Sequence, residues 1–195
     1  MRDAGIGRLL VASLHQGIAD RLPDRLEFYE NWLNPRGLRD GTIGLAPLHA
    51  VLSFLRTEGD DYARVTTTAG EYAAQWAVSE LSAPRRWCAT KLPGPLRRRL
   101  AIGVARTLVT RAYTGSRTTL SLRKQTGSVE IKSSIFCGVR DRAPQPLCHF
   151  HAAAIARVLA ELGIPAQTTI VACQATGDGS CRIDVDMSGA VEPQA

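Results

Sequence analysis

The sequence lacks the short motifs that identify many enzymes. It contains no Walker loop, no His-Glu-x-x-His pair and no Gly-x-Ser-x-Gly elbow. Gly5-Ile6-Gly7 has neither the third glycine nor the preceding strand of a dinucleotide-binding turn, so we interpret it as the start of a helix. The acidic residues are scattered and form no evident catalytic pair. These motifs therefore assign no reaction to the chain.

Long apolar runs and a secretory leader are also absent. No apolar stretch approaches the roughly 20 residues that cross a bilayer as a helix. The run from Leu9 to Leu14 is too short to be the apolar region of a signal peptide. Five cysteines, an odd number without a dense framework, favour a reducing compartment. We expect a cytoplasmic protein, and a peripheral contact with a membrane or with pathway enzymes stays an open alternative.

The chain has a net charge of +6, and arginine supplies most of the positive charge. Arg97–Arg99, Arg106 and Arg111 lie in one predicted helix. A solvated helix face is the ordinary interpretation of such a run. An anionic membrane surface or a carboxylated ligand are the alternatives. We expect no nucleic-acid partner, because no interleaved aromatic residues, zinc finger or helix-turn-helix pattern accompany the arginines.

Residues 1–114 are predicted to be helical. Apolar residues recur there at helical spacing in several segments, which proline and glycine separate. The predicted helices are Ile6–Leu22, Arg25–Leu33, Ala46–Arg56, Tyr62–Leu81 and Pro93–Tyr113.

Residues 115–189 change to the alternating pattern of strands, interrupted by one more helix. The predicted elements are strands Thr118–Lys124 and Ser128–Cys137, a helix from Cys148 to Leu162, and strands Thr168–Gln174 and Cys181–Met187. This strand-strand-helix-strand-strand order predicts an α+β fold, with the N-terminal helices packed on a four-stranded antiparallel sheet. We expect the two parts to form one compact domain.

Four of the five cysteines could converge on one point. Cys137, Cys173 and Cys181 fall on the apolar side of their predicted strands, and Cys148 falls on the apolar stripe of its helix. A turn at Gly177-Asp178-Gly179 would bring Cys173 and Cys181 together. Four thiols suit a closed tetrahedral zinc site. Plain burial is the alternative, because free cysteine packs as a small hydrophobic residue and none of the pairs is a Cys-x-x-Cys.

Other donors near this cluster are less well placed by the pattern. His151 borders the apolar stripe of its helix, whereas His149 points away from it. A Cys173–Cys181 disulfide would need an oxidising compartment. Cys88 has no partner in any motif, and we expect it to serve in packing.

The C-terminal cysteine pattern resembles the 4-vinyl reductase domain family. The hallmark of that family is a Cys that opens the last helix, a second Cys, a Gly-Asp turn, and then Cys-Arg-aromatic-Glu. This chain has Cys148–His151, Cys173 and Cys181–Val185 at these positions, with Ile183 and Asp184 in place of the aromatic residue and the Glu. The Cys-His-aromatic-His opening is most similar to the bacteriochlorophyll-pathway branch of the family. The resemblance covers about forty residues.

The resemblance implies a fold shared with vesicle-tethering TRAPP subunits, which dimerise through their helices, and with the sensor domains of phenol-responsive activators. In those sensors three Cys and one Glu hold a zinc ion. The Cys positions correspond to Cys148, Cys173 and Cys181, but the Glu position is Ile170. The resemblance therefore leaves three alternatives: Cys137 is the fourth ligand, a nearby His replaces it, or the metal is lost. We expect a homodimer with structural zinc.

The resemblance also implies an apolar ligand pocket among the helices and the sheet. The candidate lining residues are Trp32, Phe54, Trp76, Phe136 and His151. The implied ligand is a protochlorophyllide- or chlorophyllide-like tetrapyrrole, which the protein would help to reduce or deliver. The sequence has no nicotinamide, flavin or iron–sulfur motif to supply the electrons, so enzymatic activity stays an open question.

Two further functions remain as alternatives. The chain could be a small-molecule sensor domain with structural zinc and no catalysis, or an interaction subunit. A large apolar pocket would favour tetrapyrrole binding, and a small closed one would favour the sensor. A filled core with an exposed helical patch would favour the interaction subunit.

Overall fold

The computed structural model describes residues 7–33, 44–84, 87, 91–113, 115–123 and 125–188. The helices are α1 (Arg8–Arg21), α2 (Leu26–Glu30), α4 (Leu45–Thr57), α5 (Asp60–Ser79), α7 (Gly94–Ala112) and α8 (His149–Glu161). The strands are β1 (Arg117–Arg123), β2 (Thr126–Lys132), β3 (Gln167–Ala172) and β4 (Cys181–Asp186). Short 3₁₀ helices are η1 (Pro23–Arg25), η2 (Ile135–Cys137) and η3 (Gln174–Thr176). The predicted α+β class with a four-stranded antiparallel sheet is confirmed.

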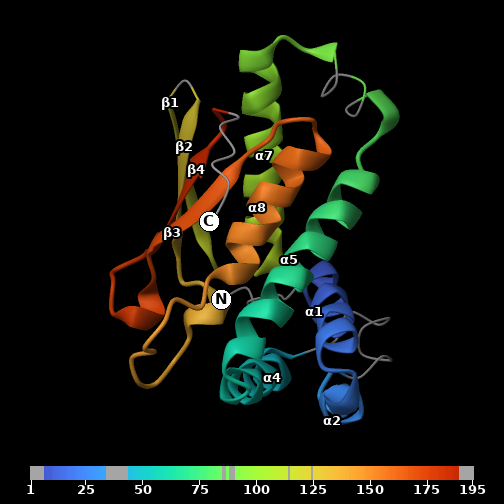
Figure 1. Cartoon of the computed structure of the whole chain (residues 1–195), viewed down its shortest axis with the longest axis vertical. Helices are drawn as coiled ribbons and strands as arrows, with labels where there is room; N and C mark the ends of the chain where they lie inside the picture. Colours follow the sequence, from blue (N-terminus) through green and yellow to red (C-terminus); the bar gives the residue numbers. More distant parts are fainter. Residues whose placement is uncertain are drawn as a thin grey trace, which may run out of the picture.

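The strands lie in the order β1-β2-β4-β3, and each neighbouring pair is antiparallel. β4 is therefore a central strand, and its side chains alternate between buried and exposed along its whole length. Figure 1 shows α7 and α8 beside the sheet, with α5 and α1 further out. The sheet and the helices thus form successive layers, and α8 lies between β3 and α5.

Helix α5 is central among the helices because it packs closely against both α1 and α8. Two glycines permit these close approaches. A Cβ at Gly17 would lie 2.7 Å from the carbonyl oxygen of Val65, and a Cβ at Gly70 would lie 2.4 Å from that of Phe150. Both distances are far below van der Waals contact, so a larger residue at either position would push the helices apart.

The predicted strand Ser128–Cys137 is too long. β2 ends at Lys132, because Ser133 takes the left-handed conformation with φ of 58° and breaks the extended chain. Ile135, Phe136 and Cys137 then form η2, and all three are buried. An alternating strand would have exposed one of them. The strand-parity argument for Cys137 is therefore wrong, although its conclusion that this thiol is buried is correct.

The other boundaries differ little from the predicted ones. The aromatic segment Arg25–Leu33 forms only the short α2 after η1, and α5 begins at Asp60 rather than Tyr62. In the part of the chain that the structure describes, no helix combines the length and hydropathy that crossing a membrane requires. Cys88 lies outside the described residues.

Candidate functional site

Four buried thiols meet where the sheet and α8 join. The Sγ atom of Cys137 lies 3.2 Å from that of Cys148, 3.5 Å from that of Cys173 and 3.4 Å from that of Cys181. The Sγ atoms of Cys148 and Cys173 are 3.3 Å apart, and all four lie within 4.8 Å of one another. These distances exclude disulfides, whose sulfur atoms are about 2.05 Å apart. The convergence that the sequence suggested is thus present.

Each thiol comes from the end of a different element. Cys137 closes η2, Cys148 caps α8 at its N-terminus, Cys173 follows β3, and Cys181 opens β4. The segment between the last two contains Gly177, whose φ of 109° is a conformation that glycine adopts easily. Asp178 fixes this turn, because its Oδ2 accepts a hydrogen bond of 2.9 Å from the backbone N–H of Cys173.

Backbone amides also point at the sulfur atoms. The N–H of Leu147 donates to Sγ of Cys173 at 3.3 Å, and the N–H of Gln174 donates to Sγ of Cys181 at 3.4 Å. Such bonds stabilise thiolates, which are the form of cysteine that binds metals. Hydrogen bonds from the thiols of Cys137 and Cys148 hold the pKa of Cys173 far below its ordinary value. Hydrogen bonding to Cys137 raises the pKa of Cys148, so the cluster without an ion favours a single thiolate.

The donor set fits a tetrahedral metal ion. With metal–sulfur bonds of about 2.3 Å, the edges of a four-sulfur tetrahedron are about 3.8 Å. Four of the sulfur–sulfur distances, at 3.2–3.5 Å, are slightly shorter, and the remaining pairs are within 4.8 Å. A small contraction or expansion of these edges would accommodate the ion. The four cysteines can therefore hold a metal with no open coordination position.

The residues offered as alternative fourth ligands lie elsewhere. Ile170 is on β3, opposite Ile183. His151 is fully buried, and its Nε2 is 3.0 Å from the hydroxyl of Ser134 rather than near a thiol. Burial lowers the pKa of His151 to about 4, so its ring is neutral at pH 7. His149 is half-buried on the first turn of α8. Cys137 supplies the fourth sulfur atom.

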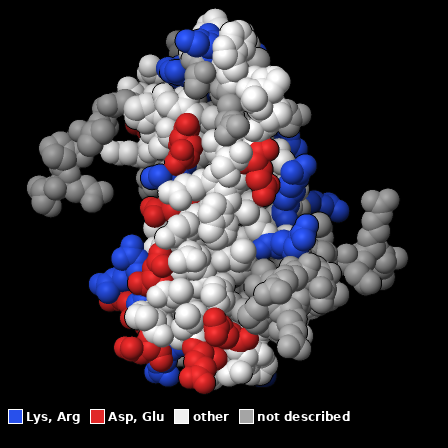
Figure 2. All heavy atoms as spheres, turned by 90° about the vertical axis from the view of Figure 1, so that its right-hand side faces the viewer, with Lys and Arg blue, Asp and Glu red and all other residues white. Residues whose placement is uncertain are grey.

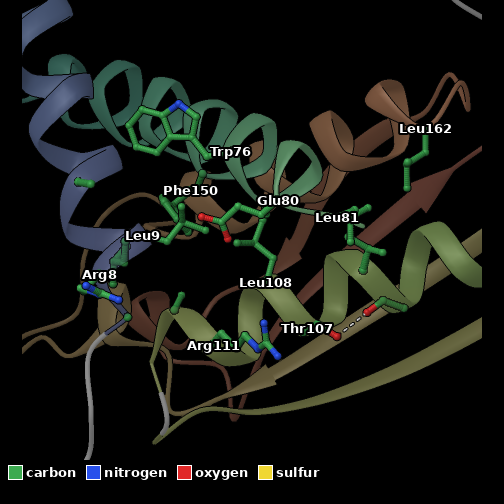
Figure 3. Close-up of a pocket in the computed structure, with 18 of the residues that line it drawn as sticks. Arg8, Leu9, Trp76, Glu80, Leu81, Thr107, Leu108, Arg111, Phe150 and Leu162 are labelled. Carbon is green, nitrogen blue, oxygen red and sulfur yellow. Dashed lines mark hydrogen bonds between the residues drawn. The ribbon is translucent and has the colours of Figure 1, made fainter. Parts of the chain in front are cut away.

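A wide groove of about 1490 Å³ opens beside this centre, between α1, α5 and α7. Figure 3 shows Trp76 and Phe150 on one side of it and Leu108 and Arg111 of α7 on the other. Leu100 and Val104 of α7 also line it, and both are only partly buried. The groove is thus largely apolar on its walls and open to solvent.

Gly103 lies in the middle of α7 and lines the same groove. A Cβ added to it would meet no described atom within 4 Å, in contrast to Gly17 and Gly70. Its carbonyl oxygen accepts a hydrogen bond of 2.9 Å from the hydroxyl of Thr107 (Figure 3). Glycine in a helix interior is less stable than alanine by roughly 0.5–1 kcal/mol. No close packing among the described residues explains this glycine, and its effect is to widen the groove.

The five candidate pocket residues do not lie together. Trp76 lines the groove. Trp32 and Phe54 pack on each other with ring centroids 5.8 Å apart, and each is 40% exposed at the surface of α2 and α4. Phe136 and His151 are buried in the core. Sequence reasoning missed Gly103 as a groove residue, although a glycine within a helical pattern was a usable signal.

Comparisons with known proteins agree with the site and with the fold. The model of the 4-vinyl reductase domain matches residues 128–186, which run from β2 to β4 and contain all four clustered cysteines. No curated protein matches the chain.

Three solved structures illustrate the fold likeness. A trafficking protein particle complex subunit 3 from Naegleria fowleri, covalently bound to palmitic acid, aligns with a TM-score of 0.51 and 12% identity over 76% of this chain and 95% of that one. An Fe(II) unliganded H-NOX protein from K. algicida aligns with a TM-score of 0.54 and 13% identity over 97% of this chain and 100% of that one. The phenol-responsive sensory domain of the transcription activator PoxR, bound to phenol, shares 17% identity over 74% of each chain, but its TM-score of 0.44 is too low to establish a common fold.

At these identities the first two alignments concern the fold alone. The family match is more specific, because it coincides with the segment that carries the four thiols. It supports assignment of residues 128–186 to the 4-vinyl reductase domain family.

Proposed function

We propose that this chain is a small-molecule-binding domain in which the groove between α1, α5 and α7 receives an apolar ligand. The groove volume of about 1490 Å³ exceeds the roughly 300–1,000 Å³ of pockets for drug-sized ligands. A large open groove suits a broad, flat ligand better than a small phenol-like one. This proposal agrees with the family match but does not depend on the remote structural alignments.

Gly103 is the observation that carries the proposal. It weakens α7 and has no packing role among the described residues, so the empty space beside it has to serve something other than stability. A ligand lying against the backbone of α7 at this point would fill that space. The half-buried ring of Trp76 on the opposite wall offers an apolar face for stacking.

For the ligand we propose a protochlorophyllide- or chlorophyllide-like tetrapyrrole. Its flat apolar macrocycle suits the width of the groove, and the cysteine pattern is most similar to the bacteriochlorophyll branch of the family. The protein would assist reduction of the ligand or its delivery to another enzyme. Because the sequence has no motif for a redox cofactor, a separate protein would supply the electrons for any reduction.

We propose zinc as the ion of the four-thiol centre, in a structural role. Four cysteine ligands leave no position for water or substrate, which is typical of structural zinc. The centre joins η2, α8, β3 and β4, so the bound ion would fix the start of α8, whose Phe150 forms part of the groove wall. The metal would therefore support the groove without taking part in chemistry.

A second candidate function is that of an interaction subunit that forms homodimers. Phe28, Trp32 and Phe54 form an aromatic surface cluster, and each ring is at least 40% exposed. Aromatic side chains at such exposure are common in protein interfaces. This function would leave the groove without an occupant, so ligand binding distinguishes the two candidates.

The test is a titration of protochlorophyllide against tryptophan fluorescence, with variants at one position. Gly103→Phe places a ring in the groove without a clash in the folded chain, whereas Gly103→Ala adds only a methyl group to open space. We expect the Phe variant to lose binding by at least tenfold and the Ala variant to bind as the wild type does. Equal binding by all three proteins would contradict the proposed site.

A further inference from the structure

We infer that the groove selects ligands that carry a free carboxylate, and that Arg8 and Arg111 together bind this group at one end of the groove. The inference rests on the proposed function and goes further, because it names a ligand class and the two residues that recognise it. It would apply to any apolar carboxylic acid of suitable size.

The backbone brings the two arginines to one place. The N–H of Gly7 donates a hydrogen bond of 3.1 Å to the carbonyl oxygen of Ala112, which joins the start of α1 to the end of α7. Arg8 follows the donor and Arg111 precedes the acceptor, and both residues line the groove. Figure 3 shows them entering from α1 and α7, with Glu80 of the opposite wall between them and Trp76. This junction is one end of the groove.

The positive charge there is not neutralised. Among the described residues, no carboxylate lies within ion-pair distance of Arg8 or Arg111, and both side chains are exposed. The groove is lined by three arginines, of which Arg99 is the third, and by a single carboxylate, that of Glu80. The lining is therefore net positive and suits an anionic group.

The charge pattern of the sequence strengthens this asymmetry. Between Leu81 and Val129 the chain has eleven Lys and Arg residues and no Asp or Glu. The whole chain has 24 basic and 18 acidic residues, so the rest of it is net acidic. Figure 2 shows the same separation on one face, where basic side chains gather along one margin and acidic ones towards the lower end. Local residues of α7 thus cannot neutralise the groove, but a ligand carboxylate can.

The position of Arg8 also has no stabilising explanation within its helix. It lies in the first turn of α1, which has no acidic residue and no side-chain cap. A positive charge there opposes the helix dipole. An anion beside Arg8 would reverse this unfavourable interaction, and a guanidinium pair offers several donors to one carboxylate.

The geometry also fixes the orientation of the ligand. Arg99 is twelve residues before Arg111 on α7, which corresponds to about 18 Å along the helix axis. Val104 and Gly103 lie between these two charges. A ligand with its carboxylate at the junction of Arg8 and Arg111 would therefore place its apolar body against the open backbone of Gly103 and the ring of Trp76.

The experiment compares protoporphyrin IX with its dimethyl ester, two probes that share the macrocycle and differ in the carboxylates. Each is titrated against wild type, the double variant Arg8→Gln/Arg111→Gln, and the control Arg106→Gln. Arg106 is exposed on the same helix but does not line the groove. Urea unfolding verifies that all three proteins are folded.

We expect the free acid to bind wild type about tenfold more tightly than the ester at low salt, since two charge-assisted contacts distinguish them. In the double variant this ratio should fall to about one, with the ester affinity unchanged. Arg106→Gln should keep the wild-type ratio, and high salt should narrow it.

Two results would overturn the inference and leave the proposed function standing. The first is equal binding of acid and ester to wild type, with both lost in Gly103→Phe. The second is a ratio that falls equally in Arg106→Gln and in the double variant, which would indicate only a diffuse field. If neither probe binds, or if Gly103→Phe has no effect on binding of the ester, the proposed function itself fails.

Discussion

The ring of Phe136 stacks on the ring of Phe150, with centroids 4.8 Å apart and ring planes 20° apart. Phe136 immediately precedes Cys137, and Phe150 is the second residue after Cys148. Both rings are fully buried, and Phe150 also lines the groove. The stack therefore joins two of the thiol-bearing segments to the wall of the groove, and changes at the four-thiol centre can reach the ligand through packed side chains.

Metal removal should weaken ligand binding. Without the ion, Cys137 and Cys148 lose their common partner, and the Phe136–Phe150 stack that they flank loses its fixed position. We expect the affinity for protochlorophyllide to fall about tenfold after zinc is removed with a chelator and to recover when zinc is added back. By linkage, bound ligand should slow removal of the metal. An affinity that does not respond to metal would show that the two sites are independent.

Cys137→Ser should remove the metal and destabilise the domain. A serine hydroxyl is a poor replacement for a thiolate at a zinc ion, and binding of a structural metal contributes directly to the free energy of folding. We expect the free energy of unfolding to fall by at least about 2 kcal/mol and zinc content to fall well below one ion per chain. Cys88→Ser provides the comparison, because Cys88 is the cysteine outside the four-thiol cluster. Full zinc content in Cys137→Ser would mean that the fourth ligand is another group.

These predictions depend on residues that sequence reasoning located unequally well. The alternating pattern of Cys181–Met187 and the helical stripe after Cys148 located β4 and α8 almost to the residue, because burial on one face is written directly into residue order. The same pattern predicts a strand at Cys137 instead of a 3₁₀ turn, since the left-handed conformation of Ser133 leaves no trace in the order of apolar residues. The groove could not be predicted either. It depends on how α1, α5 and α7 are spaced, and partly buried residues such as Leu100 have the same spacing as core residues.

Two glycines in helix interiors should respond oppositely to alanine. Gly103→Ala adds a methyl group to open space and improves helix propensity, so unfolding should require about 0.5–1 kcal/mol more. Gly70→Ala places a Cβ 2.4 Å from the carbonyl oxygen of Phe150, so the domain should lose about 1–3 kcal/mol. Urea unfolding of the two variants beside wild type measures both. If Gly103→Ala were also destabilising, the space beside α7 would have to be filled by protein.

His151 should make the domain less stable in mild acid. Burial lowers the pKa of His151 to about 4 in the folded chain, from an ordinary value of 6.5. The unfolded chain therefore binds a proton that the folded chain excludes, and stability falls as pH drops from 6.5 towards 4, by roughly 3 kcal/mol in total.

The comparison protein for this test is His151→Gln, which cannot titrate. Loss of metal in acid affects both proteins, so the difference between their free energies of unfolding isolates the histidine. We expect that difference to change in favour of the variant between pH 7 and pH 4.5. Parallel pH profiles for the two proteins would show that His151 is accessible to protons in the folded state.

Mass spectrometry of the freshly purified chain, under native and then denaturing conditions and with and without protochlorophyllide, tests the central claim most directly. The account predicts one zinc ion per chain under native conditions and one macrocycle per chain when the ligand is added, with both lost on denaturation. Gly103→Phe should retain the zinc and lose the macrocycle. A native spectrum with neither metal nor macrocycle would contradict the claim that this domain binds a ligand beside a metal-braced wall.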